Sequence, residues 1–160
     1  MTTDIHEIQV ACFRLGGDIY AADIMRIKEI IRLQKLTTLP KSPPFVEGVL
    51  NLRGSVIPVI DLRKRFDLPA ADYGKDTRLL IVSVGRQGLG LVVDEVTEVI
   101  TVPVKDIKPS PMVSNGGCVD YLIGVCLFRE SLIMLLNLDK ILSVQESDEL
   151  MRLDVAVKQR

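Results

Sequence analysis

A repeated segment constrains the fold of this chain more than any other feature of its sequence. GVLNLRGSVIPVIDL, at residues 48–62, aligns without a gap on GVCLFRESLIMLLNL, at residues 124–138. The alignment places Arg53 on Arg129, and in each copy the arginine lies between two apolar runs, where a β-hairpin would turn. The chain therefore contains two related structural units.

The repeat extends upstream of these two segments. GDIYAAD aligns on GLGLVVD, and IKEII aligns on VTEVI after a shift of two residues (residues 17–23, 88–94, 27–31 and 96–100). The second of these alignments places Glu29 on Glu98. The two halves of the chain are thus expected to have the same order of elements.

Most apolar segments are short, rich in β-branched residues and bounded by Gly, Asp or Pro, which is typical of β-strands. Hydrophobic residues make up 48% of the chain, but aromatic residues only 4%, so Val, Ile and Leu must build the core. We predict ten strands, five in each half, at about residues 5–15, 18–23, 28–33, 49–53, 55–61, 78–85, 88–93, 95–102, 121–128 and 131–137. Short helical pieces, LRKRF and LDKIL, are expected to follow the two hairpins.

Five short, twisted strands would leave open edges, so we expect each half to close into a small SH3-like β-barrel. The predicted fold is mostly β, with two five-stranded barrel subdomains at residues 1–68 and 78–142. The polar segment 69–77 is expected to cross between them, because it contains a Pro and a Gly. Residues 143–160 are predicted to form a C-terminal helical tail, and all parts together form one domain.

The charge of the chain is nearly balanced. Its net charge is −1, with +2 in residues 1–75 and −3 in residues 76–160. Neither half has the basic character that binding to nucleic acid or to anionic membranes usually requires. No apolar run reaches the ~18 residues of a membrane span. We therefore expect a cytoplasmic protein that neither binds nucleic acid nor inserts into a membrane.

The sequence shows no recognisable catalytic or metal-binding pattern. Its three cysteines fit no metal-ligand spacing, and the single histidine, His6, has no group to orient it. No glycine cluster precedes a helix, which argues against a phosphate-binding loop. Asp23 and Asp94 have equivalent positions at strand ends, which favours a structural role over acid–base chemistry. We expect no enzyme, cofactor or metal; an enclosed small-ligand barrel is the alternative.

The segment DIMRIKEIIRLQ is too apolar for a strand that shows one face to a small barrel. Ile24, Ile27, Ile30 and Ile31 crowd around Glu29 in this segment. One interpretation is that these isoleucines fill the seam between the two barrels. The other is that some of them line an exposed groove for a partner helix, because contiguous apolar surface commonly marks an interface.

Glu29 also offers a partner for the hairpin arginine. The third strand of the first unit brings this carboxylate within reach of Arg53, so we predict that the two side chains pair at the rim of the groove. Pairing of this kind need not stabilise the fold, which favours a role in recognition. The alternative is a solvated surface pair that contributes about 0–1 kcal/mol.

These residues give the chain a resemblance to the CheW family of bacterial chemotaxis coupling proteins. The resemblance runs from about residue 5 to residue 155. The segments that carry it are DIMRIKEI, FVEGVLNLRGSVIPVIDLR, GLVVDEVTEV, YLIGV and LIMLLNLDKIL. The long string around NLRG makes a chance match a poor explanation.

The resemblance implies a non-catalytic adaptor of two five-stranded barrels around a hydrophobic seam. Such an adaptor joins the cytoplasmic tip of methyl-accepting chemotaxis receptors to the regulatory domain of the histidine kinase CheA, in the cytoplasm at membrane-associated receptor arrays. The implied receptor-binding groove comprises Ile27, Glu29, Ile30, Arg53 and Val99. Gly48 and Gly54 are implied as structural turn positions. The alternative is an adaptor of a related chemosensory pathway, such as pilus-based or surface motility or developmental control.

Overall fold

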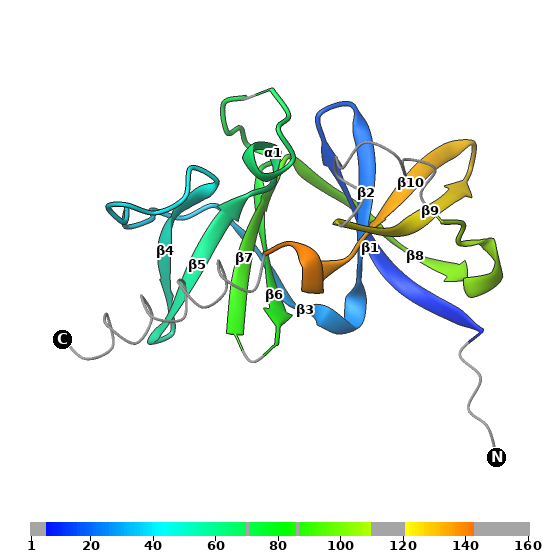
Figure 1. Cartoon of the computed structure of the whole chain (residues 1–160), viewed down its shortest axis with the longest axis horizontal. Coiled ribbons are helices and arrows are strands. Elements are labelled where there is room, and N and C mark those ends of the chain that lie inside the picture. Colours follow the sequence, from blue (N-terminus) through cyan, green and yellow to red (C-terminus); the bar gives the residue numbers. More distant parts are fainter. Residues whose placement is uncertain (1–5, 70, 86, 110–120, 143–160) are drawn as a thin grey trace, which may run out of the picture.

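The computed structural model describes residues 6–69, 71–85, 87–109 and 121–142, and these residues form mainly β-strands (Figure 1). The strands are β1 (Glu7–Leu15), β2 (Asp18–Asp23), β3 (Ile27–Arg32), β4 (Val46–Leu52), β5 (Ser55–Asp61), β6 (Arg78–Val84), β7 (Gln87–Val93), β8 (Glu95–Pro103), β9 (Leu122–Phe128) and β10 (Ser131–Leu136). The short helices are η1 (Ile24–Arg26), α1 (Leu62–Arg65), η2 (Val104–Asp106) and η4 (Leu138–Lys140). The ten predicted strands and the two predicted helical pieces are confirmed. The predicted C-terminal helix lies outside the described residues.

The strands form two five-stranded sheets. Sheet A has the order β8-β1-β2-β10-β9, and sheet B has the order β3-β6-β7-β5-β4. The prediction that residues 1–68 and 78–142 form separate subdomains is therefore wrong, because each sheet takes strands from both halves. At the centre of each sheet lies a parallel pair, β2 with β10 and β5 with β7. A short hairpin cannot join parallel neighbours, and in both pairs the partner strand comes from the other half of the chain.

The crossings between the sheets also differ from the prediction. Segment 69–77 connects β5 to β6 within sheet B, and the Tyr73 hydroxyl donates a hydrogen bond of 2.8 Å to Asp61 at the end of β5. The chain instead crosses at η1, between β2 and β3, and at Asp94, between β7 and β8. At η1, the Asp23 carboxylate caps the short helix by accepting a hydrogen bond of 2.9 Å from the Met25 amide.

Each sheet is linked across its two outer strands by backbone hydrogen bonds. Thr37, which follows β3, exchanges bonds of 3.0 and 2.8 Å with Val49 of β4. Lys108, which follows β8, exchanges two bonds of 2.8 Å with Val125 of β9. The chains approach closely at both places: a Cβ on Gly48 or Gly124 would lie 2.4 Å from the carbonyl oxygen of Thr37 or Lys108, respectively. Only glycine fits such an approach.

One apolar cluster holds the two sheets together, and each sheet also has an apolar cluster of its own. The seam core contains buried side chains from both sheets, including Phe13 and Tyr20 from sheet A and Ile60, Leu80 and Leu91 from sheet B. The sheet-A core consists of Val10, Cys12, Ala21, Ile100, Val102, Cys126, Ile133 and Leu135. The sheet-B core consists of Leu50, Ile57, Val59, Leu79, Ile81 and Val92. Each sheet thus has its own core, and the seam between the sheets is itself filled.

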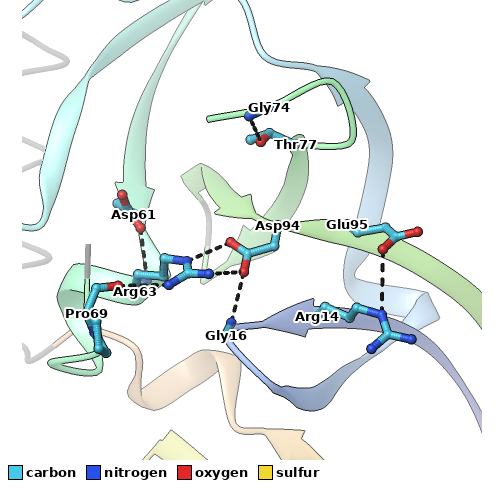
Figure 2. Close-up of polar contacts among 9 residues, drawn as sticks. All are labelled: Arg14, Gly16, Asp61, Arg63, Pro69, Gly74, Thr77, Asp94 and Glu95. Atoms are coloured by element: carbon cyan, nitrogen blue, oxygen red, sulfur yellow. Dashed lines mark hydrogen bonds and ion pairs between the residues drawn. The ribbon is translucent and has the colours of Figure 1, made fainter. Parts of the chain in front are cut away.

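An arginine–aspartate clamp holds each crossing. At the first, Arg26 donates to the Ser83 carbonyl oxygen and forms an ion pair of 2.7 Å with Asp139. At the second, Asp94 forms an ion pair with Arg63 through two hydrogen bonds and accepts a third, of 2.9 Å, from the Gly16 amide (Figure 2). We call these contacts the crossover clamps.

No helix among the described residues is both long and apolar enough to cross a membrane.

Candidate protein-docking site

The isoleucines around Glu29 divide between the two interpretations drawn from the sequence. Ile27 is half-buried and packs against the seam core, and Ile31 packs against the sheet-B core. Ile30, between them, is 39% exposed. β3 is therefore anchored in two cores and still exposes an apolar side chain at the surface.

Glu29 and Arg53 form the ion pair that the sequence predicted. Arg53 donates from Nη1 to Oε2 of Glu29 at 2.7 Å and from Nη2 to Oε1 at 3.2 Å. The Arg53 side chain is 76% exposed and the Glu29 side chain 26%. The two-bond geometry fixes the plane of the guanidinium, and the remaining N–H donors stay available to a partner.

The backbone of Arg53 has a conformation that is unusual for an arginine. Arg53 has a φ of +53°, in the left-handed region, within the turn between β4 and β5. Gly54 follows with a φ of +86°, and its amide donates a hydrogen bond of 3.1 Å to the Asn51 side chain. Glycine, asparagine or aspartate suits a left-handed position better than arginine does. The side chain of Arg53, and not its turn propensity, must account for its presence.

Val99 lies apart from the other predicted groove residues. It belongs to β8 in sheet A, whereas Ile30 and Glu29 lie on β3 in sheet B. Val99 is 52% exposed and follows Glu98, as Ile30 follows Glu29. The structure thus places Val99 at the position of sheet A that corresponds to Ile30 of sheet B.

A second ion pair, which the sequence reasoning missed, lies next to Val99. Glu98 Oε2 lies 3.7 Å from Nη1 of Arg129 in the turn between β9 and β10. The guanidinium of Arg129 also lies 4.9 Å from the centre of the Phe128 ring, a cation–π contact. The alignment of Glu29 on Glu98 and of Arg53 on Arg129 was the signal that could have predicted this pair.

Asp23, Asp94 and Cys12 lie in surroundings that favour a structural role over a catalytic one. Asp23 caps η1, and Asp94 belongs to a crossover clamp. Burial, aided by Glu98 and Cys126, raises the pKa of the Cys12 thiol to about 11, which suppresses its reactive thiolate form. Among the described residues, no group of three or more His, Cys, Asp and Glu side chains could hold a metal ion.

The fold and this site define a two-sheet β protein that displays an oriented arginine–carboxylate pair and exposed apolar side chains at its surface. A family model described as the CheW-like domain matches residues 9–146. The chain belongs to this family, and it is a coupling adaptor of chemotaxis signalling.

Individual relatives agree with the family match. The chain is 34% identical to the chemotaxis protein CheW of Treponema pallidum over 157 residues, which cover 96% of this chain and 92% of that protein. It is 33% identical to CheW of Klebsiella aerogenes over 134 residues, 84% and 81% of the two chains. The crystal structure of the scaffolding protein TtCheW from Thermoanaerobacter tengcongensis superimposes with a TM-score of 0.81 at 32% identity, covering 91% of this chain and 94% of that chain.

Proposed function

We propose that this chain is a non-catalytic adaptor that couples the cytoplasmic tip of methyl-accepting chemotaxis receptors to the regulatory domain of the histidine kinase CheA. The observation that carries the proposal is the Glu29–Arg53 ion pair, held in a two-bond geometry beside the exposed Ile30. We call these three residues the first rim. An exposed pair of this kind contributes only about 0–1 kcal/mol to stability, so stability alone does not account for it.

The geometry of the first rim suits a receptor helix. Ile30 offers apolar contact, and the guanidinium of Arg53 offers fixed donors for carbonyl or carboxylate groups on the partner. β3 is held in place by its antiparallel pairing with β6, from Ile27 with Val82 to Arg32 with Arg78. A rigid strand lets the rim bind without a large loss of conformational entropy.

The proposal includes a closed form for each sheet. The bonds of Thr37 with Val49 and of Lys108 with Val125 join the outer strands, which supports two SH3-like barrels. Barrels have no open strand edges, so partners must bind through side chains at the rims. Each contact is expected to be weak, on the order of micromolar. Linked receptors and kinases on the cytoplasmic side of the membrane then raise the effective concentration and stabilise an array.

Reconstitution with receptor-containing membranes and CheA tests the proposal. We expect Ile30→Asp and Arg53→Glu each to lower receptor-coupled CheA autophosphorylation by about tenfold or more, because each removes a rim contact worth at least ~1.4 kcal/mol. Ile30 is a better site for this test than Ile27, since Ile27 also packs against the seam core. Circular dichroism melting curves check that both variants fold.

Two matched substitutions serve as controls. Val104→Asp changes an apolar residue that is 42% exposed in η2, next to sheet A, and Lys75→Glu reverses an exposed charge in segment 69–77. Both are expected to couple receptor to kinase as the unmodified chain does. Full coupling by folded Ile30→Asp and Arg53→Glu variants would refute the role of the first rim.

A further inference from the structure

The two sheets are built in the same way from opposite halves of the chain, with residues 1–68 as the first half and residues 69–160 as the second. In sheet A, β1 and β2 of the first half lie among β8, β9 and β10 of the second. In sheet B, β6 and β7 of the second half lie among β3, β4 and β5 of the first. The strand orders β8-β1-β2-β10-β9 and β3-β6-β7-β5-β4 correspond place by place, so each half fills the same places as the other.

The pairing register is also the same in both sheets. The pairs Ala11–Val99, Cys12–Glu98 and Phe13–Val96 of sheet A correspond to the pairs Leu80–Ile30, Ile81–Glu29 and Val82–Ile27 of sheet B. The register shifts at the same place in each sheet, between the second and third of these pairs. Backbone hydrogen bonds follow the register, so they would form equally well between the first halves of two copies of the chain. Side chains must therefore select the pairing of a first half with a second half.

The crossover clamps are side-chain contacts between the halves, and their charges are in opposite order. At the first clamp, the cation Arg26 belongs to the crossing and the anion Asp139 to the short helix η4, with 2.7 Å between Nη2 and Oδ1. At the second, the anion Asp94 belongs to the crossing and the cation Arg63 to α1, with 2.8 Å between Nε and Oδ1. The repeat aligns Arg63 on Asp139, so equivalent positions of the two helices carry opposite charges.

This charge order disfavours the pairing of equal halves. Two first halves would place Arg26 of one copy against Arg63 of the other, and two second halves would place Asp94 against Asp139. The side chains of Arg63 and Asp94 are only 15% and 30% exposed, so solvent would screen repulsion there incompletely. Like charges brought together in this way select against the wrong partner.

A third contact between the halves has the same effect. Arg14 lies opposite Glu95 in the register of sheet A and forms an ion pair of 3.6 Å with it, beside the second clamp (Figure 2). In sheet B the register gives the place of Glu95 to Arg26 and the place of Arg14 to Ser83, whose carbonyl oxygen accepts a hydrogen bond from Arg26. Two first halves would thus also bring Arg14 against Arg26, whereas the observed fold gives each arginine an acidic partner.

We propose that the opposite charge order of the crossover clamps makes each first half pair with a second half, and prevents a dimer in which equal halves of two copies pair. Segment 69–77 joins the halves and spans about 30 Å when extended, so the halves of one chain can reach two separate pairs in such a dimer. The clamps then act through repulsion in the wrong arrangement as well as attraction in the right one. This proposal is independent of the proposed function.

Reversal of the charge on both helices tests the proposal in the full chain. In the double variant Arg63→Asp/Asp139→Arg, both clamps become like-charged within one copy, but opposite charges meet when equal halves of two copies pair. We expect its dimerisation constant to be about 100-fold higher than that of the unmodified chain. Four contacts in each dimer change sign, and each is expected to contribute at least about threefold. Sedimentation velocity over a series of protein concentrations measures this constant.

Cross-linking of a mixture of isotope-labelled and unlabelled copies shows which halves pair. Cross-links between copies of the double variant should join first half to first half and second half to second half. The matched control Arg63→Gln/Asp139→Asn removes the same charges without reversing them, so it should be less stable but no more dimeric than the unmodified chain. Adding Arg26→Asp and Asp94→Arg to the double variant restores opposite charges within one copy and should restore the monomer.

Each other outcome contradicts the proposal. A folded, monomeric Arg63→Asp/Asp139→Arg variant would show that the charge order does not select the pairing. Equal dimerisation of the Arg63→Gln/Asp139→Asn control would show the same, as would cross-links that join first halves to second halves. If the double variant is unfolded, the clamps stabilise the fold without specifying which halves pair, and the proposal is wrong.

Discussion

Arg53 shows how a single residue can be retained against its own backbone preference. A non-glycine residue in a sparsely populated backbone region costs roughly 1–3 kcal/mol, and an exposed ion pair contributes at most about 1 kcal/mol. The pair with Glu29 therefore does not fully offset the strain. In the proposed function, binding to a partner is the reason to keep an arginine at this turn.

This balance predicts that Arg53→Gly separates folding from binding. Glycine relieves the left-handed strain but also increases the entropy of the unfolded chain, so the free energy of unfolding should change by less than about 1 kcal/mol. Receptor-coupled CheA activity should nevertheless fall by about tenfold or more. Urea unfolding and the coupling assay measure the two effects. A large loss of stability with intact coupling would show that the pair serves the fold.

Gly48 is required because the Thr37 carbonyl oxygen leaves no room for a side chain at this position. Gly48→Ala places a Cβ 2.4 Å from the Thr37 carbonyl oxygen, so the strand or the bridge must shift. We expect the free energy of unfolding to fall by about 2–3 kcal/mol. Gly17→Ala is the matched control, since a Cβ there meets no atom within 4 Å, and it should change stability by less than about 1 kcal/mol. Equal stabilities of the two variants in urea would contradict the account.

The crossover clamps act between elements, where the chain passes from one sheet to the other. Burial tends to raise the pKa of Asp94, but the hydrogen bonds from Arg63 and the Gly16 amide outweigh it and hold the pKa below its ordinary value. The hydrogen bonds from Arg26 likewise lower the pKa of Asp139, against a smaller effect of burial. A carboxylate with a lowered pKa stabilises the fold above its ordinary pKa of 3.8, and this contribution is lost as the pH falls through the lower value of the folded protein.

Asp94→Asn tests this pH dependence. At neutral pH the variant should unfold more easily by about 2 kcal/mol, because Arg63 loses a charge-assisted partner. The difference should shrink as the pH falls below about 4, where the Asp94 carboxylate of the unfolded chain begins to take up its proton, and should vanish only below the lowered pKa of the folded protein. Urea unfolding at several pH values measures both effects.

Glu95→Gln provides the control for the clamp. Its exposed ion pair with Arg14, at 3.6 Å, lies beside the clamp in Figure 2 and should contribute less than about 1 kcal/mol at any pH. A pH-independent difference between Asp94→Asn and the unmodified chain would contradict the ionic role of the clamp.

At the scale of the whole molecule, the exchange of strands makes folding depend on both halves. Residues 1–68 contain β1 and β2 of sheet A and β3–β5 of sheet B, so neither sheet is complete within them. The seam core is divided in the same way, with Phe13 and Tyr20 in one half and Leu80 and Leu91 in the other. The two halves are therefore similar in sequence without being separate folding units.

A fragment of residues 1–68 is accordingly expected to be largely unfolded by itself. The sheet-B core forms where β4 and β5 pack with β6 and β7, and the fragment lacks β6 and β7. The apolar side chains of β4 and β5 therefore remain exposed to water. Far-UV circular dichroism and urea titration check this, and mixing with residues 69–160 should restore a cooperative transition. Cooperative unfolding of residues 1–68 alone would show that the first half folds independently.

Much of the site could be predicted from residues that belong to the same repeat unit and are therefore close in the sequence. The ten strands followed from alternating apolar patterns, and the Glu29–Arg53 pair followed from the position of one hairpin beside one strand. The Glu98–Arg129 pair was encoded by the same alignment. Val99 lies on the other sheet, as the assignment of residues 78–142 to a second barrel predicted, but the pairing of its strand β8 with β1 of the first half was not predicted, because it depends on which sheet β8 joins.

The sequence by itself determined where strands begin and turn, because those features depend on the side-chain pattern of neighbouring residues. Only the tertiary structure decided that β2 pairs with β10 and β5 with β7, so that the halves exchange strands and the β4–β5 and β9–β10 hairpins lie on opposite sides of the molecule. The choice of strand partner depends on burying apolar faces that are distant in the chain, and similar repeats offer nearly the same local pattern for either choice.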